Sequence, residues 1–271
     1  MNTTDNKPII IGIGGLARSG KDIFVKIAKK ILKENGYSCI KLAFADALKE
    51  EIDPFLREQY NISAWTDDNQ EKQLIRPYLV AHGCGKRIIS NGRYWVDKID
   101  QAIESIHFNE DVIFISDCRF PNEADWLHEK WGGWLVHLKK YSVRMDVDHG
   151  KLSPNESQFY SDYPNLATNN IPKKEIKIYD QAPNAEEASN DPLCEQKSDY
   201  RLELENCIER ERRLTGNKIS TESLMDYSYL VNEIIACLTK CPFLTIQNPS
   251  KPKSIWSSVV NQTKIVSLET Q

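Results

Sequence analysis

The 271-residue chain lacks several features that would place it outside the ordinary globular enzymes. It has no apolar run long enough to span a membrane, and its polar first seven residues do not form the pattern of a secretory signal. Its seven cysteines include no Cys-x-x-Cys pair, so we interpret them as reduced thiols. The five histidines show no metal-ligand spacing, and no Gly-x-Ser-x-Gly elbow is present. These absences predict a cytoplasmic protein without a zinc site.

An excess of positive charge is also missing. The chain has 35 Lys and Arg against 39 Asp and Glu, a net charge of −4. Such a balance gives no general attraction to nucleic acid or to an anionic membrane, so we expect neither as a partner. Local basic clusters could still bind phosphates. The length allows one large core, or one core with an inserted module.

Strand and helix patterns alternate along the first 140 residues. Apolar runs separated by helical stripes predict an α/β fold with a mainly parallel sheet flanked by helices. Five strands are expected, at residues 8–13, 38–44, 111–116, 134–138 and 175–179. The run at 111–116 is continuously apolar, as in a strand that is covered on both faces.

The rest of the chain divides by composition. We expect a core over residues 1–180, in which the polar stretch 141–174 is either a lid or an ordinary surface loop. Residues 181–220 are highly charged and predict an insertion, for which a solvated excursion without chemistry is the simplest interpretation. A C-terminal helix at 221–240 is expected to pack on the core, and the tail 241–271 gives no firm prediction.

The most specific pattern is a glycine loop between the first strand and the first helix. It reads Gly15-Leu-Ala-Arg-Ser-Gly-Lys-Asp22, the context of a phosphate-binding P-loop. Lys21 would reach the β- and γ-phosphates, and Asp22 stands where a Mg²⁺-binding hydroxyl is usual. The predicted phosphate-binding residues are Gly15, Ala17, Arg18, Ser19, Gly20, Lys21 and Asp22. The alternative is a tight turn with an incidental lysine.

Two other strands end in acidic residues. Asp117 follows the third strand, at the sheet edge where ligands bind in open α/β folds, and would hold Mg²⁺ or its water. Arg119 is two residues on and suits a pair of phosphate oxygens. The alternative is a capping Asp beside a surface Arg. Asp46 follows the second strand and is either a helix N-cap, a substrate contact or both.

A basic cluster surrounds the segment Gly83–Gly85, which we expect to be a glycine loop. It contains Arg76, Lys86, Arg87 and Arg93. Each residue alone is an ordinary surface residue, but together they suit a kinase whose acceptor is itself a phosphate, because both of its substrates are anions. Trp95 lies on an apolar helical stripe and is predicted to be core rather than a base-stacking ring.

The motifs described above follow one another in an order and spacing that resemble those of the bacteriophage deoxynucleoside monophosphate kinases, over about half of the chain. The matching segments are Arg18–Asp22, Phe44–Lys49, Arg76 with Gly83, Tyr94–Val96 and Asp117–Ala124. The resemblance implies a P-loop kinase core, transfer of the ATP γ-phosphate to a deoxynucleoside monophosphate with Mg²⁺, a phage origin and work in the host cytoplasm. Ile23 departs from the family, which often has Thr there, and the stretch 181–220 has no counterpart.

The roles that follow are predictions by residue. Lys21, Asp117 and Arg119 are the expected catalytic residues, and Asp22 and Asp117 the expected Mg²⁺ ligands. The acceptor is assigned to Asp46, Arg76, Lys86, Arg87, Arg119 and Glu123. The alternatives are another P-loop kinase, acting on a different small molecule or on nucleic acid, a non-catalytic nucleotide-binding protein, and a hydrolase for which no water-orienting residue is evident. A homodimer is left open.

Overall fold

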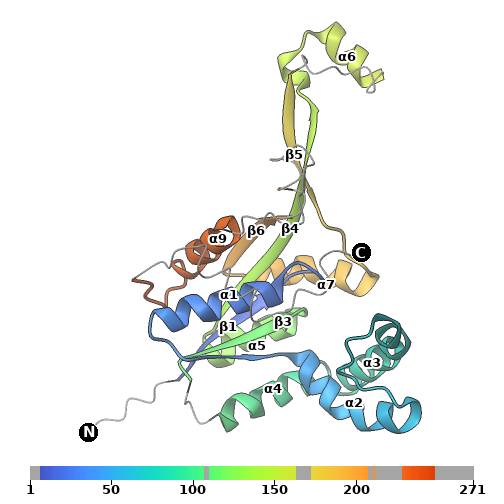
Figure 1. The fold of residues 1–271 in the computed structure, drawn as a ribbon, viewed down its shortest axis with the longest axis vertical. Coiled ribbons are helices and arrows are strands. Elements are labelled where there is room, and N and C mark those ends of the chain that lie inside the picture. The colour runs from blue at the N-terminus through green and yellow to red at the C-terminus, as the bar shows by residue number, and fades with distance from the viewer. Residues whose placement is uncertain (1–6, 107–109, 163–171, 207–209, 211–227, 248–271) are drawn as a thin grey trace, which may run out of the picture. The chain divides into compact units, whose positions relative to one another are not determined.

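The computed structural model describes residues 7–106, 110–162, 172–206, 210 and 228–247. The chain divides into two compact units. The core unit comprises Met1–Leu138, Ala182–Leu202 and Tyr227–Gln271, and the arm unit comprises Lys139–Gln181 and Glu203–Asp226 (Figure 1). The final stretch 248–271 of the predicted tail, and most of 207–227, lie outside the described residues.

The core unit is built on a parallel sheet whose central strand leads into the glycine loop Gly15–Asp22. Strand β1 lies between β3 and the first half of β4, and β2 is on the far side of β3, all parallel. The strands are β1 (Ile9–Gly14), β2 (Cys39–Leu42), β3 (Val112–Cys118) and β4 (Trp134–Val147). The predicted fold class, a mainly parallel α/β sheet flanked by helices, is confirmed.

Helices cover both faces of this sheet (Figure 1). α1 packs against α9 on one side, and α4 and α5 lie on the other. Alternate residues of β1 point to opposite faces, so Ile10 joins the apolar cluster of α4 and α5, which includes Trp95 and Leu127. Trp95 is therefore core, as predicted. The helices are α1 (Lys21–Glu34), α4 (Arg93–Ser105), α5 (Pro121–Trp131) and α9 (Ser228–Leu238).

Two further helices form a hairpin with a small core of its own. α2 (Phe44–Tyr60) and α3 (Asn69–Ile89) enclose Ile52, Leu56, Ala64 and Ile75. The glycine loop expected at Gly83–Gly85 is wrong, because this segment is helical and belongs to α3. A Cβ on Gly83 would lie 2.6 Å from Leu48 Cδ1, so glycine here permits α2 and α3 to approach closely.

The stretch 181–220 holds more regular structure than its composition suggested. It contains α7 (Ala185–Lys197) and a sixth strand, β6 (Tyr200–Glu205), which pairs with β4. α7 packs on α5 and β1. Its second half is fixed by Asp191, whose carboxylate lies 2.9 Å from Nε2 of the fully buried His137. The sheet therefore has one strand more than the five predicted.

The arm unit contains the predicted fifth strand, but this strand is antiparallel. β5 (Lys173–Tyr179) pairs with the second half of β4 from Tyr141↔Tyr179 to Val147↔Lys173. A 3-10 turn, η1 (His149–Lys151), and a helix, α6 (Pro154–Asp162), follow β4. The lid role of 141–174 stays a prediction, and residues 163–171 of it are outside the described part. None of the described helices is both long and apolar enough to cross a membrane.

Gly15 and Gly36 offer a matched test of the fold. Both have positive φ, +119° and +88°, but only a Cβ on Gly15 would collide with the carbonyl oxygen of Leu138. Gly36→Ala should cost about 1 kcal/mol of stability through backbone strain alone. Gly15→Ala should cost roughly 1–3 kcal/mol more, because it adds overpacking. Urea unfolding of both variants measures the difference, and equal losses would contradict the close contact between β1 and β4.

Candidate functional site

The loop between β1 and α1 is strongly curled. Gly15, Arg18 and Gly20 all have positive φ, of 119°, 64° and 95°. Arg18 is not a glycine, so its left-handed conformation is a local strain that the surrounding loop maintains. Among the described residues, the buried Oγ of Ser19 has no hydrogen-bond partner. A curled loop with an unused buried hydroxyl at the N-terminus of a helix has the properties of an anion cradle.

Lys21 is folded back over this loop. Its Nζ donates to the carbonyl oxygens of Gly15 at 2.7 Å and Leu16 at 2.6 Å. Burial, the largest cause, and the positive charge of Arg119 together lower the pKa of Lys21 to about 8, against the charges of Glu187, Asp117 and Asp22. Its hydrogen bonds go to neutral oxygens, so its charge is available to an anion entering the loop.

A carboxylate from α7 already contacts the loop. The backbone N–H of Ala17 donates to Oε2 of Glu187 at 2.8 Å, and Nη1 of Arg119 lies 3.3 Å from its Oε1. Glu187 is 8% exposed. Sequence analysis missed it, since it lies in the stretch interpreted as a solvated insertion. The Asn184-x-x-Glu187 spacing is a helix-start signal, and Asn184 does accept from the Glu187 N–H, but that signal does not predict the contact with the loop.

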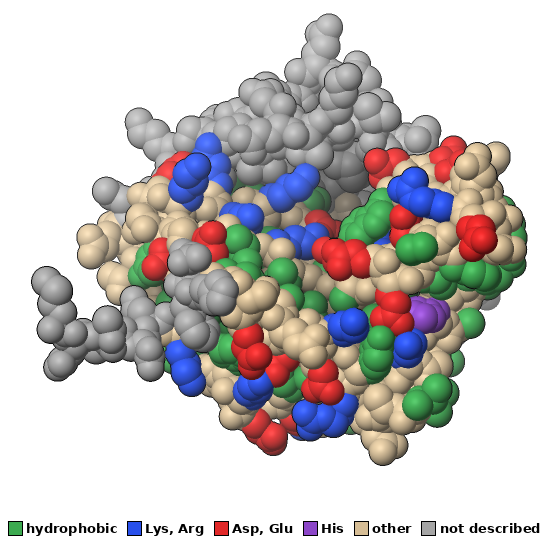
Figure 2. Space-filling view, turned by 90° about the horizontal axis from the view of Figure 1, so that it is seen from below, with side chains coloured by type: hydrophobic (Ala, Val, Ile, Leu, Met, Phe, Trp, Pro, Cys, Tyr) green, Lys and Arg blue, Asp and Glu red, His purple; other side chains and the backbone are tan. Residues whose placement is uncertain are grey.

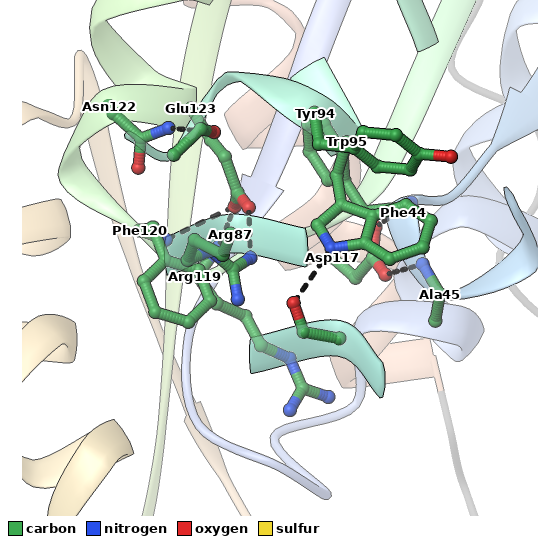
Figure 3. A network of polar contacts seen from close by, with 12 residues as sticks. Phe44, Ala45, Arg87, Tyr94, Trp95, Asp117, Arg119, Phe120, Asn122 and Glu123 are labelled. Atoms are coloured by element: carbon green, nitrogen blue, oxygen red, sulfur yellow. Dashed lines mark hydrogen bonds and ion pairs between the residues drawn. The ribbon is translucent and has the colours of Figure 1, made fainter. Parts of the chain in front are cut away.

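Asp117 joins the end of β3 to the start of α2 (Figure 3). Its Oδ1 accepts from the Phe44 N–H and its Oδ2 from the Ala45 N–H, both at 2.8 Å. Burial raises the pKa of Asp117, while these two hydrogen bonds act in the opposite direction. Asp117 thus caps α2. The N-cap role considered for Asp46 is wrong, because Asp46 lies in the first turn and Ala43 occupies the cap position.

Glu123 organises the start of α5 and holds an arginine. Its Oε2 accepts from the N–H groups of Arg119 at 2.8 Å and Phe120 at 3.1 Å, and its Oε1 accepts from Nη2 of Arg87 at 3.1 Å. The Arg87 guanidinium also lies 3.4 Å above the Phe120 ring centre. Figure 3 shows Arg87 between the Glu123 carboxylate and this ring. Burial raises the pKa of Glu123 to about 7, against the charge of Arg87.

These residues surround a pocket of about 220 Å³. Its floor is the carboxyl edge of the sheet, and its walls come from α2, α3 and α7. Aromatic, apolar, cationic and acidic side chains all contribute, and the lining includes Phe44, Leu48, Lys49, Val80, Arg87, Trp95, Asp117, Arg119, Phe120, Glu123, Glu186, Glu187 and Asn190. The structure therefore brings together the predicted Arg87, Asp117, Arg119 and Glu123.

The rest of the predicted basic cluster is placed differently. Lys86 Nζ lies 2.9 Å from Oε1 of Glu51 and faces the Tyr94 ring, away from the pocket lining. Arg93 pairs with Asp97 at 3.2 Å and is exposed. Arg76 is exposed on α3, four residues before Val80 and so on the same helix face. Of the four, Arg87 alone lines the pocket.

The predicted Mg²⁺ ligands lie at the same edge. Asp22 accepts a hydrogen bond from Lys41 Nζ at 2.7 Å. Burial acts to lower the pKa of Lys41, but the hydrogen bond to Asp22 and the charges of Asp22, Asp46 and Asp117 raise it above its ordinary value. Across the described residues, no group of three or more His, Cys, Asp or Glu side chains is placed to hold a metal by itself. The metal roles of Asp22 and Asp117 stay predictions.

Comparison with known proteins adds little to this geometry. No family model and no curated protein matches the chain. Among solved structures, a shikimate kinase from Acinetobacter baumannii in complex with shikimate is 12% identical, with a TM-score of 0.31 over 79% of this chain and 97% of that one. The protein TT1252 from Thermus thermophilus is 18% identical, also at 0.31, over 77% and 95%. Such scores assign neither family nor function, so the site is interpreted from its own residues.

The Glu123 carboxyl group predicts a pH effect on stability. Its pKa of about 7 in the folded protein exceeds the ordinary 4.5, so between these values the folded state keeps a proton that the unfolded chain has lost. Stability from this group therefore falls as pH rises through that window. In Glu123→Gln, the fall in unfolding free energy between pH 5 and 7.5 should be smaller than in the wild type. Exposed Glu50→Gln is the control, and an unchanged difference in Glu123→Gln would contradict the assignment.

Proposed function

We propose that this protein is a kinase that transfers the γ-phosphate of ATP to a nucleoside monophosphate, with deoxynucleoside monophosphates as the substrate class that the sequence resemblance implies. One observation carries the proposal. Glu187 contacts both the Ala17 N–H of the P-loop and the Arg119 guanidinium of the pocket, at 2.8 and 3.3 Å. The Ala17 N–H and the Arg119 guanidinium are both groups of the kind that binds phosphate oxygens, and both contact the same carboxylate. They therefore lie close together, as transfer between two phosphates requires.

The P-loop is proposed to hold ATP. Its curled backbone and the Lys21 ammonium suit the β- and γ-phosphates, and the free Ser19 hydroxyl adds a donor. Bound Mg²⁺ neutralises charge that develops on the phosphate oxygens. Asp22 and Asp117 supply the hard oxygen atoms that such an ion takes, directly or through water. With Ile23 at the position where the resembled kinases often have Thr, the adjacent hydroxyl is absent.

The pocket is proposed to hold the acceptor. Arg87 and Arg119 suit its phosphate, because guanidinium groups bind two oxygens at once. The rings of Phe44 and Phe120 provide an apolar wall of the kind that a nucleobase contacts. No strong general base is required, because the attacking oxygen already belongs to an anion. Glu123 would orient Arg87. Asp46, Arg76 and Lys86 do not line this pocket, and their roles toward the acceptor stay predictions.

The alternatives make distinguishable predictions. Figure 2 shows acidic and basic side chains interspersed on one face, without an unbroken basic stripe for nucleic acid. A non-catalytic nucleotide-binding protein is the second candidate, since a carboxylate contacts the P-loop. A screen of ribo- and deoxynucleoside monophosphates with ATP and Mg²⁺ decides between them, because only the kinase forms diphosphates. Lys21→Ala should abolish this product without unfolding the protein, and full activity in that variant would reject the P-loop assignment.

Lys21 also predicts a pH dependence of ATP binding. Its pKa of about 8 means that the ligand-free protein loses this charge as pH rises through 8. ATP favours the charged form, so the ATP dissociation constant should increase by about tenfold between pH 7 and 9. Lys21→Arg keeps its charge throughout and should remove most of this change. Calorimetry at both pH values measures it, and identical profiles in the two proteins would show that Lys21 does not bind phosphate.

A lysine at position 87 tests the acceptor site, because it keeps a positive charge beside the buried Glu123. Arg87→Lys keeps a positive charge but loses the planar group that stacks on Phe120 and binds two oxygens. A charge-assisted contact contributes about 1.5–3 kcal/mol, so kcat/KM for the monophosphate should fall about tenfold or more. The loss should be equal for every accepted base, with little change for ATP. Arg93→Lys is the control, and full activity of Arg87→Lys would place the acceptor elsewhere.

A further inference from the structure

The contact between Glu187 and the P-loop points to a control on nucleotide entry. We propose that the first turn of α7 is a gate, in which the Glu187 carboxylate occupies a phosphate-oxygen position of the P-loop until ATP displaces it. The inference rests on the proposed function, because it concerns the same loop. It adds a regulatory element from a part of the chain that the sequence resemblance does not cover.

Glu187 uses the partners that a phosphate oxygen would use. A charge buried to this extent is costly unless it is paired and hydrogen-bonded. Its pairing comes from the P-loop N–H of Ala17 and from the Arg119 guanidinium. Its negative charge also acts to raise the pKa of Lys21, which places it within the electrostatic range of the P-loop lysine. An entering phosphate would compete with it for the same groups.

The two halves of α7 are attached unequally. The second half is anchored in the core unit by Asp191 on His137, by the buried Cys194, and by Lys197, whose Nζ donates to Asp125 at 2.5 Å. In the first turn, Glu187 is the only buried side chain. The side chain of its neighbour Glu186 has one polar contact with the described residues, 3.8 Å from Cys84 Sγ. The first turn can therefore leave while the second half stays in place.

Pro192 loosens the turn that joins Glu187 to the anchored part of α7, which begins at Asp191. It lies inside α7 and has no backbone N–H, so the helical hydrogen bond to the carbonyl of Ala188 is missing. The missing bond falls between Glu187 and the anchored Cys194. Bending at this point moves Glu187 without disturbing the core contacts of the second half.

The gate has two consequences for the proposed reaction. Apparent ATP affinity is reduced by the fraction of molecules in which Glu187 occupies the loop. Displacement of Glu187 also removes the partner that holds Arg119, so ATP binding would free this guanidinium for the phosphates. ATP entry and the readiness of Arg119 are thereby coupled.

The first test is ATP binding by Glu187→Gln, measured by calorimetry with Mg²⁺ and without acceptor. Loss of the charge weakens the closed state, so ATP should bind about tenfold or more tightly than in the wild type. Glu195→Gln makes the same change of charge in the anchored half and should bind ATP as the wild type does. Unchanged or weaker binding in Glu187→Gln overturns the gate while the P-loop assignment stands. Absence of binding in all three proteins overturns both.

The second test is hydrogen exchange in the wild-type protein, which separates a moving gate from simple removal of a repulsive charge. Saturating ATP should increase exchange at the backbone amides of residues 185–190 and decrease it in the P-loop, with residues 193–197 unchanged. Greater protection of 185–190 with ATP would show that Glu187 is part of the bound site and would overturn the gate. No change there would overturn it equally.

Discussion

The backbone N–H groups at the starts of helices and in the loop before α1 need hydrogen-bond acceptors, and this requirement organises the whole site. Helices leave their first N–H groups without internal partners, and the P-loop presents such groups as well. Two buried carboxylates, those of Glu123 and Glu187, and the half-buried Asp117 accept hydrogen bonds from these groups. Asp117 accepts from the start of α2, Glu123 from the residues before α5, and Glu187 from Ala17 in the P-loop. Asp117 and Glu187 thereby connect elements that lie far apart in the sequence, and Glu123 does so through Arg87. The pocket is therefore bounded by acids as much as by cations.

These carboxylates also place the arginines. Arg87 is held by Glu123 and stacked on Phe120, while the Arg119 guanidinium pairs with Glu187 as its one acidic partner among the described residues. The difference in restraint matters for phosphoryl transfer, which depends mainly on positioned charge. Arg87 is fixed by two contacts, whereas Arg119 would have to exchange its partner before it could bind another anion under the proposed function. The acidic net charge of the chain is thus compatible with a local site for anions.

Local patterns predicted those parts whose geometry depends on neighbouring residues. The strand–glycine–helix order around Gly15 and Lys21 predicted the curled loop, and the apolar runs predicted the parallel sheet. The prediction failed where two packed helices decided the conformation. Glycines at 83 and 85 indicated a loop, yet the contact of Gly83 with Leu48 keeps that segment helical. Lys86 and Arg87 are adjacent, but helical geometry turns only Arg87 to the pocket.

By itself the sequence determined the curled glycine loop, the class of the sheet and the strand end near which Asp117 and Arg119 stand, because strand alternation, glycine freedom and helix capping act over a few residues. Tertiary structure alone decided which carboxylate meets which N–H group. Glu187 reaches Ala17 across 170 positions, and Asp117 reaches Phe44 across 73. Those contacts arise only after β1 and β3 pair and α7 packs on α5, since long-range packing and not local preference brings the partners within hydrogen-bond distance.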